Sequence, residues 1–94
     1  MYCVYIIYSK IIDSFYIGET IDIESRIKQH NESFYETGYT KQTKDWILYY
    51  KIECNSRTQA RKIETHIKKM KSKRYIQNLK KYPEIIEKLK NKYN

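Results

Sequence analysis

The segment Tyr2–Tyr8 constrains the fold most, because it has the spacing of a strand but offers no polar face. Alternate side chains of a strand point to opposite sides. One side would carry Tyr2, Val4, Ile6 and Tyr8, and the other Cys3, Tyr5 and Ile7. Both sets are apolar or aromatic, which is typical of a strand that is covered on both faces. The segment therefore predicts the central strand of a sheet.

Two further segments have strand-like composition. Ser9–Asp13 is a plausible turn and Ser14–Glu19 a second strand, so that the first two strands would form an antiparallel hairpin. Residues Trp46–Ile52 are dominated by β-branched and aromatic side chains, which predicts a third strand. Together the three segments indicate a small, mostly antiparallel sheet.

A helix is expected directly after the hairpin. Asp22 is a good N-cap, and Ile23 and Ile27 have helical spacing in a stretch that runs to about His30. Arg26 and His30 are four residues apart and project along the same stripe as the two isoleucines. We therefore expect both polar side chains to face the body of the protein.

The segment Asn31–Lys44 is polar, contains Gly38 and has no clear period, so it is interpreted as a long loop. Loops of this length often carry function. The segment is therefore a candidate for contact with a substrate.

The second half of the chain has the pattern of successive helices. Ser56-Arg57-Thr58-Gln59 has the form of a capping box. An apolar stripe follows, formed by Ala60, Ile63, Ile67 and Met70, and Glu64 lies at its edge. Further helix is expected through Lys71–Lys80, and Pro83 opens a last helix whose charges are mixed along Glu84–Lys92.

Size and composition limit what the chain can contain. Its 94 residues predict a single domain over residues 1–94, with a core of about 1–80 and a C-terminal helix of about 83–92. No apolar run approaches the length of a membrane span, and the N-terminus lacks the layout of a signal peptide, so a cytoplasmic protein is expected. Cys3 and Cys54 could in principle pair, but in a reducing compartment they are more simply interpreted as small apolar strand residues. A zinc site is not expected, because the two cysteines and the two histidines have no close ligand spacing.

The formal net charge of +8 favours an anionic partner, and nucleic acid is the commonest one for a small basic domain. Charge does not distinguish a protein that cuts nucleic acid from one that holds it. The chain is also rich in Lys, Ile, Asn and Tyr, whose codons are A/T-rich, so genome composition is an alternative explanation for part of the lysine excess.

Five residues in chain order carry the main clue to chemistry: Tyr5, Tyr16, Arg26, His30 and Glu64. The pattern resembles the GIY-YIG nuclease superfamily, of which this chain would be a small, stand-alone, single-domain member. The first triplet reads Cys3-Val4-Tyr5 in place of Gly-Ile-Tyr, and the second is intact as Tyr16-Ile17-Gly18. The resemblance implies an α/β (α+β) fold in which helices flank a three-stranded sheet.

The resemblance also implies an endonuclease that hydrolyses DNA phosphodiester bonds. Glu64 would hold one Mg²⁺ or Mn²⁺ ion, which commonly takes only one or two protein carboxylates. Arg26 would bind the phosphate and stabilise the charge that develops on it. Tyr5 would act as general base toward the attacking water, with Tyr16 positioning water or phosphate, and His30 would assist Tyr5 or relay its proton. Supporting roles would fall to Gly18, Asn78, Lys68 and Lys71.

Each of these residues also has an ordinary interpretation. Tyrosine occurs eleven times in the chain and is common in strands, so a single tyrosine is more often a packing residue than a catalyst. Glu64 precedes Lys68 by four residues, which is the spacing of a surface ion pair. Two rival functions follow: a module of the same fold that binds nucleic acid without cutting it efficiently, and a protein-interaction domain with a tyrosine-rich surface. DNA or RNA, duplex or branched substrate, sequence specificity and oligomeric state all stay open.

Overall fold

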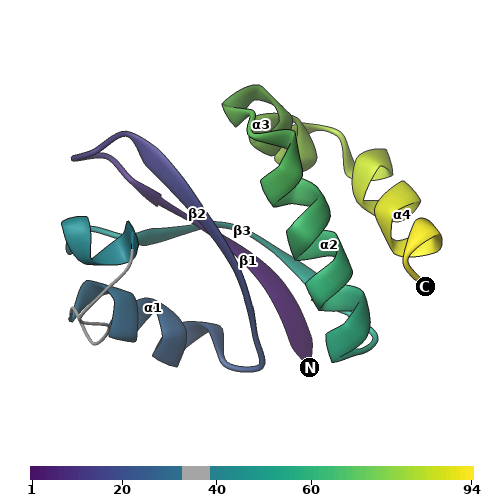
Figure 1. The fold of residues 1–94 in the computed structure, drawn as a ribbon, viewed down its shortest axis with the longest axis horizontal. Helices are drawn as coiled ribbons and strands as arrows, with labels where there is room; N and C mark the ends of the chain where they lie inside the picture. Colours follow the sequence, from purple (N-terminus) through teal and green to yellow (C-terminus); the bar gives the residue numbers. More distant parts are fainter. Residues whose placement is uncertain (33–38) are drawn as a thin grey trace.

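The computed structural model describes residues 1–32 and 39–94. Its centre is a three-stranded antiparallel sheet in the order β2-β1-β3, with β1 at Tyr2–Ser9, β2 at Ser14–Thr20 and β3 at Ile47–Cys54. Helix α1 (Ile23–Asn31) lies on one side of the sheet and α2 (Arg57–Met70) on the other, as Figure 1 shows. Helices α3 (Lys73–Lys81) and α4 (Pro83–Lys92) pack on the α2 side. The predicted α+β fold is confirmed.

The central strand β1 separates two apolar clusters. On the α2 side, Val4 and Ile6 pack with Ile63, Ile67 and aliphatic residues of α3 and α4. On the α1 side, Tyr5, Ile7 and Trp46 form a smaller cluster, to which Tyr16, Ile23 and Ile27 add partly buried side chains. The prediction that residues 2–8 form a central strand covered on both faces is confirmed.

The first helix begins where its cap predicts, because the Asp22 carboxylate accepts a hydrogen bond from the backbone N–H of Ser25 at 3.2 Å. The segment predicted as one long loop contains a short 3-10 helix, η1, at Tyr39–Gln42. Its part at residues 33–38, including Gly38, lies outside the described residues. The described end of the predicted loop therefore contains a short 3-10 helix that the sequence analysis did not predict.

The third strand begins one residue later than predicted and continues to Cys54. Trp46 precedes the strand because its main chain is already engaged elsewhere. The Asn31 side chain donates to the Trp46 carbonyl at 2.8 Å and accepts from the Trp46 N–H at 2.7 Å. This two-way contact joins the end of α1 to the start of β3.

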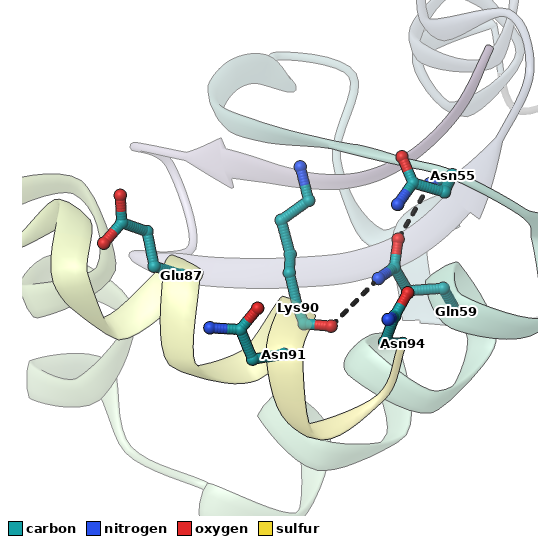
Figure 2. Close-up of a pocket in the computed structure, with 6 residues that line it drawn as sticks. All are labelled: Asn55, Gln59, Glu87, Lys90, Asn91 and Asn94. Carbon is teal, nitrogen blue, oxygen red and sulfur yellow. Dashed lines mark hydrogen bonds between the residues drawn. The ribbon is translucent and has the colours of Figure 1, made fainter.

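The predicted capping box at the start of α2 is half formed. Ser56 accepts a hydrogen bond from the Gln59 N–H at 3.1 Å. The Gln59 side chain, however, accepts from the N–H of Asn55, at 2.7 Å, rather than from that of Ser56. It also donates to the Lys90 carbonyl at 3.1 Å, so that one buried amide of α2 connects the residue that follows β3 with α4, as Figure 2 shows.

The stripe of α2 is buried at Ala60, Ile63 and Ile67, as predicted, but Met70 is 45% exposed. Met70 is exposed because α2 ends there: Lys71 adopts a left-handed backbone conformation with φ of 47°. Ser72 then caps α3, which begins two residues later than predicted, and Pro83 opens α4 as expected. Both cysteines are buried and free. No helix among residues 1–32 and 39–94 is long and apolar enough to cross a membrane.

Candidate active site

A buried chain of hydrogen bonds runs from β1 through α1 to η1. The Tyr5 hydroxyl lies 2.9 Å from Nε2 of His30, and Nδ1 of His30 lies 2.8 Å from the hydroxyl oxygen of Thr40. The exposed fractions of these three residues are only 1%, 3% and 4%. A neutral imidazole donates through one nitrogen and accepts through the other, so Tyr5 and Thr40 hold His30 in a fixed orientation.

Gly18 is the residue that makes room for Tyr5. The two residues are directly opposite each other in the β1–β2 pairing. A Cβ atom at Gly18 would lie 2.5 Å from Cζ and 2.7 Å from Cε1 of the Tyr5 ring, which is closer than carbon atoms can approach. The Tyr5 side chain thus lies over Gly18 and fills the space that a side chain at this position would need.

His30 is held in its neutral form. Burial, together with a smaller effect of the positive charge of Arg26, lowers the pKa of its imidazolium to about 4. At neutral pH the ring is therefore an uncharged hydrogen-bonding group. The prediction that His30 points into the protein is confirmed, whereas Arg26 is only partly buried and borders an open hollow.

Tyr16 lies between the Tyr5–His30 pair and helix α2. Its ring centroid is 6.4 Å from that of Tyr5 and 5.2 Å from that of His30. The Lys68 ammonium lies 5.7 Å from the Tyr16 ring centroid, and it forms an ion pair with Glu64 at 2.8 Å. Helix α2 covers the face of the sheet opposite to Tyr5 and His30. Because β2 is an edge strand, side chains of α2 such as Glu64 and Lys68 can nevertheless lie beside it.

Arg26 borders a hollow of about 230 Å³ at the far end of β2, together with Tyr2, Glu19, Thr20, Ile21 and Arg57. Glu19 pairs there with Arg57 at 3.4 Å and with Arg61 at 3.7 Å. The edge strand is therefore bordered by cations from α1 and from α2. Guanidinium groups in such a place can bind a phosphate through paired N–H groups.

Two of the predicted supporting residues are not joined to this group of side chains. Asn78 is half-buried on α3, and its side chain makes no hydrogen bond to a described residue. Lys71 is exposed at the end of α2 and borders a separate hollow of about 210 Å³, which Lys68 shares. The structure therefore brings together Tyr5, Tyr16, Gly18, His30, Lys68 and Glu64, with Arg26 nearby, but not Asn78.

Sequence reasoning missed Thr40 and the residues that position it. The Trp46 indole donates to the Thr40 carbonyl at 2.9 Å, and Asn31 fixes the Trp46 main chain. No local pattern marks Thr40, since it lies in the segment interpreted as a loop. The ion pairs of Glu19 were also missed, although Arg57 and Arg61 have the four-residue spacing of one helical face.

Within the described part of the chain, no group of three or more His, Cys, Asp or Glu side chains is arranged to hold a metal ion. A site built on one carboxylate is compatible with Mg²⁺, which keeps several waters and takes phosphate oxygens as ligands. Glu64 fits that description, because its side chain is 19% exposed at the edge of the site. Lys68 would have to release Glu64 to a metal ion, and its own 47% exposure leaves it room to move.

A family model described as the GIY-YIG catalytic domain matches residues 1–81. The chain is also similar to a UPF0213 protein of Syntrophus aciditrophicus (strain SB), with 35% identity over 69 residues. That match covers 73% of this chain and 79% of the relative. No solved structure matches the chain significantly.

Proposed function

This chain belongs to the GIY-YIG family, and on that premise we propose that it is a metal-dependent endonuclease that hydrolyses phosphodiester bonds of DNA. The observation that carries the proposal is the continuous series of contacts across β2. It runs from His30 to Tyr5 and Tyr16, and then through Lys68 to Glu64. A possible base from β1 and a cation and a carboxylate from α2 thus lie on either side of the edge strand β2.

Tyr5 acts as the general base in this proposal in its phenolate form, which the positive charges of Arg26 and of a bound metal ion would favour. The phenolate oxygen takes one proton from the attacking water while the water oxygen bonds to phosphorus and the bond from phosphorus to the departing oxygen breaks. An imidazole whose conjugate acid has a pKa of about 4 is a weak base. A tyrosine hydroxyl is ordinarily a far weaker acid than such an imidazolium, so full proton transfer from Tyr5 to His30 would be unfavourable. His30 therefore orients the Tyr5 oxygen by a hydrogen bond and does not store its proton.

The phosphate is held by cations on both sides of β2. Arg26 stabilises the charge that develops on the non-bridging oxygens, and Tyr16 positions water or phosphate beside Tyr5. Lys68 binds a phosphate oxygen when it leaves Glu64. Each of these groups is partly exposed, as contact with a large polyanion requires.

Glu64 would hold one divalent cation. Family members generally use such a metal, which stabilises negative charge on the phosphate and on the departing oxygen. Mg²⁺ or Mn²⁺ suits a single carboxylate with waters completing the coordination. Release of Glu64 from Lys68 makes the carboxylate available to the metal ion and the ammonium available to a phosphate oxygen of the substrate.

The decisive experiment incubates the purified protein with supercoiled plasmid and with a branched DNA, in the presence of Mg²⁺, Mn²⁺ or EDTA. We expect cleavage that needs the metal and is lost in Glu64→Ala. Glu87→Ala is the matched control, because it removes an exposed carboxylate from α4 and should cut normally. Equal cleavage by Glu64→Ala and wild type would refute the assigned role of Glu64.

A second variant tests the general base. Tyr5→Phe keeps the ring but removes the hydroxyl, and loss of general base catalysis typically costs about 10²- to 10⁴-fold in rate. We expect single-turnover cleavage to fall by that factor while DNA affinity, measured by fluorescence anisotropy, stays within about twofold. A rate that changes less than tenfold would exclude Tyr5 as the base.

A second candidate function is a module that binds nucleic acid without cutting it efficiently. The observation that favours it is the 2.8 Å ion pair, which engages the Glu64 carboxylate with Lys68. In that case wild type and Glu64→Ala would be equally inert, yet both would bind DNA with an affinity that falls steeply with salt.

A further inference from the structure

Positive charge on α2 is not confined to the side that borders β2. A hollow of about 310 Å³ lies between α2 and the C-terminal end of α4. It is lined by Arg61, Lys62, Thr65, His66, Lys69 and Tyr93. Three of these six residues are permanent cations and none is acidic, so the hollow is suited to an anion.

The charges in the hollow are poorly neutralised. Lys62 and Lys69 are exposed, and within residues 1–32 and 39–94 neither forms an ion pair. Lys68 and Lys73 differ from them, because Lys68 pairs with Glu64 and Lys73 with Asp13. Cations of one sign around a concave surface attract a polyanion more strongly than isolated charges do.

The wall of the hollow is built from contacts between α2 and the chain after α4. Nδ1 of His66 lies 2.9 Å from the Tyr93 hydroxyl, and the two rings meet edge to face with centroids 5.7 Å apart. The His66 ring also lies 6.2 Å from that of Tyr75. Burial lowers the pKa of His66, and Lys92 and Lys69 lower it in the same direction by their positive charge. The positive charges of Lys92 and Lys69 thus both act on the His66 side chain in the wall of the hollow.

Arg61 connects this hollow with the candidate active site. It lines the hollow and also forms an ion pair with Glu19 of β2 at 3.7 Å. Arg61, Thr65 and Lys69 follow one another at intervals of four residues, which aligns them along one side of a helix. A polyanion that passes the edge of β2 therefore meets Arg61 first, and then the hydrogen-bond donors of Thr65 and Lys69 along the same side of α2.

We propose that the hollow between α2 and α4 is a second nucleic-acid contact, in which Lys62, Lys69 and Arg61 bind backbone phosphates of the DNA outside the candidate active site. This inference rests on the proposed function in taking DNA as the ligand. Phosphate contacts fix the position and register of a duplex without reading its sequence. The second contact gives a domain of this size a larger DNA-binding surface than the edge of β2 alone provides.

The test measures binding of a short fluorescein-labelled DNA duplex by anisotropy at several salt concentrations. All variants carry Glu64→Ala, so that binding is measured without cleavage. For the double variant Lys62→Gln and Lys69→Gln, we expect weaker binding and a slope of log K against log salt that is shallower by about 1.8, or 0.9 for each lost phosphate contact. Restoring the charges with Lys62→Arg and Lys69→Arg should restore the slope.

The matched control is the double variant Lys81→Gln and Lys88→Gln, which removes the same charge from exposed positions outside the hollow. Equal slopes for the two double variants would overturn the inference, as would an absence of DNA binding by the Glu64→Ala parent. Failure of the proposed nuclease function can be told apart from failure of the second DNA contact. If wild type does not cleave DNA but its DNA binding still depends on Lys62 and Lys69, the nuclease function is refuted and the second contact is supported.

Discussion

The two faces of the central strand differ in how their buried side chains are held. On the α2 face, Val4 and Ile6 meet aliphatic residues such as Ile63, whose contacts are numerous and not directional. On the α1 face, Tyr5 and His30 are buried to a similar degree but joined by hydrogen bonds, which need defined distances and angles. One strand thus separates a layer that mainly stabilises the fold from a layer that positions reactive groups.

The two faces of the sheet should therefore differ in how well they tolerate amino-acid substitutions. An aliphatic cluster can repack around a smaller side chain at a cost in stability, whereas a buried polar chain loses its geometry when one member changes. Three measurements test this contrast, beginning with the largest expected effect on the free energy of unfolding.

Ile63→Ala should reduce the free energy of unfolding by about 2–5 kcal/mol, because it removes a fully buried side chain from the α2 face. Urea denaturation followed by circular dichroism measures the change. Thr65→Ala, at an exposed position of the same helix, should stay within about 0.5 kcal/mol of wild type. The contrast also requires cleavage per folded molecule to be unchanged in Ile63→Ala, and a large loss would break it.

Acidification should weaken the α1 face through His30. Since the pKa of His30 is lowered to about 4 in the folded protein, the unfolded chain binds the extra proton between the ordinary value of about 6.5 and about 4. The free energy of unfolding therefore falls as the pH falls through this window, by about 2 kcal/mol at about pH 5.

Urea titrations at about pH 7 and about pH 5 measure this loss. Most of it should disappear in His30→Gln, whatever that variant does to stability at neutral pH. His66→Gln is the control, because His66 also has a lowered pKa but is less buried, so the variant should keep the larger part of the loss. An unchanged loss in His30→Gln would show that other groups produce it.

Gly18→Ala should cost about 1–3 kcal/mol, the usual penalty for overpacking, because the new methyl group meets the Tyr5 ring. The penalty should be smaller in a Tyr5→Leu background, where the shorter side chain leaves space. A double-mutant cycle of unfolding free energies measures the coupling between the two positions. Additive effects would mean that the ring moves aside without cost.

The sequence predicts the layers well, because alternation and helical spacing report burial directly. Residues 2–8 show two apolar faces and occupy the centre of the sheet, and Ile63 and Ile67 form the buried stripe of α2. Asp22 and Ser56 mark the starts of their helices, because capping acts within a few residues of the chain. Met70 fits the same stripe but is exposed, because a left-handed residue ends the helix there.

Contacts between distant segments were not predictable in the same way. Thr40 meets His30 only because Asn31 and Trp46 fold η1 against α1, and no periodic pattern encodes that approach. Gln59 was predicted to cap its own helix, but its amide also bonds to the Lys90 carbonyl, 31 residues away. The roles assigned to Tyr5, Tyr16, Arg26, His30 and Glu64 stay predictions until cleavage is measured.

The close approach of Gly18 to Tyr5 has a consequence for the evolution of the chain. The space that a side chain at position 18 would need is already filled by the aromatic ring of position 5. A lineage that gained a methyl group at position 18 would be under selection for a smaller residue at position 5. The glycine at the end of the second triplet and the tyrosine at the end of the first should therefore be inherited as a pair.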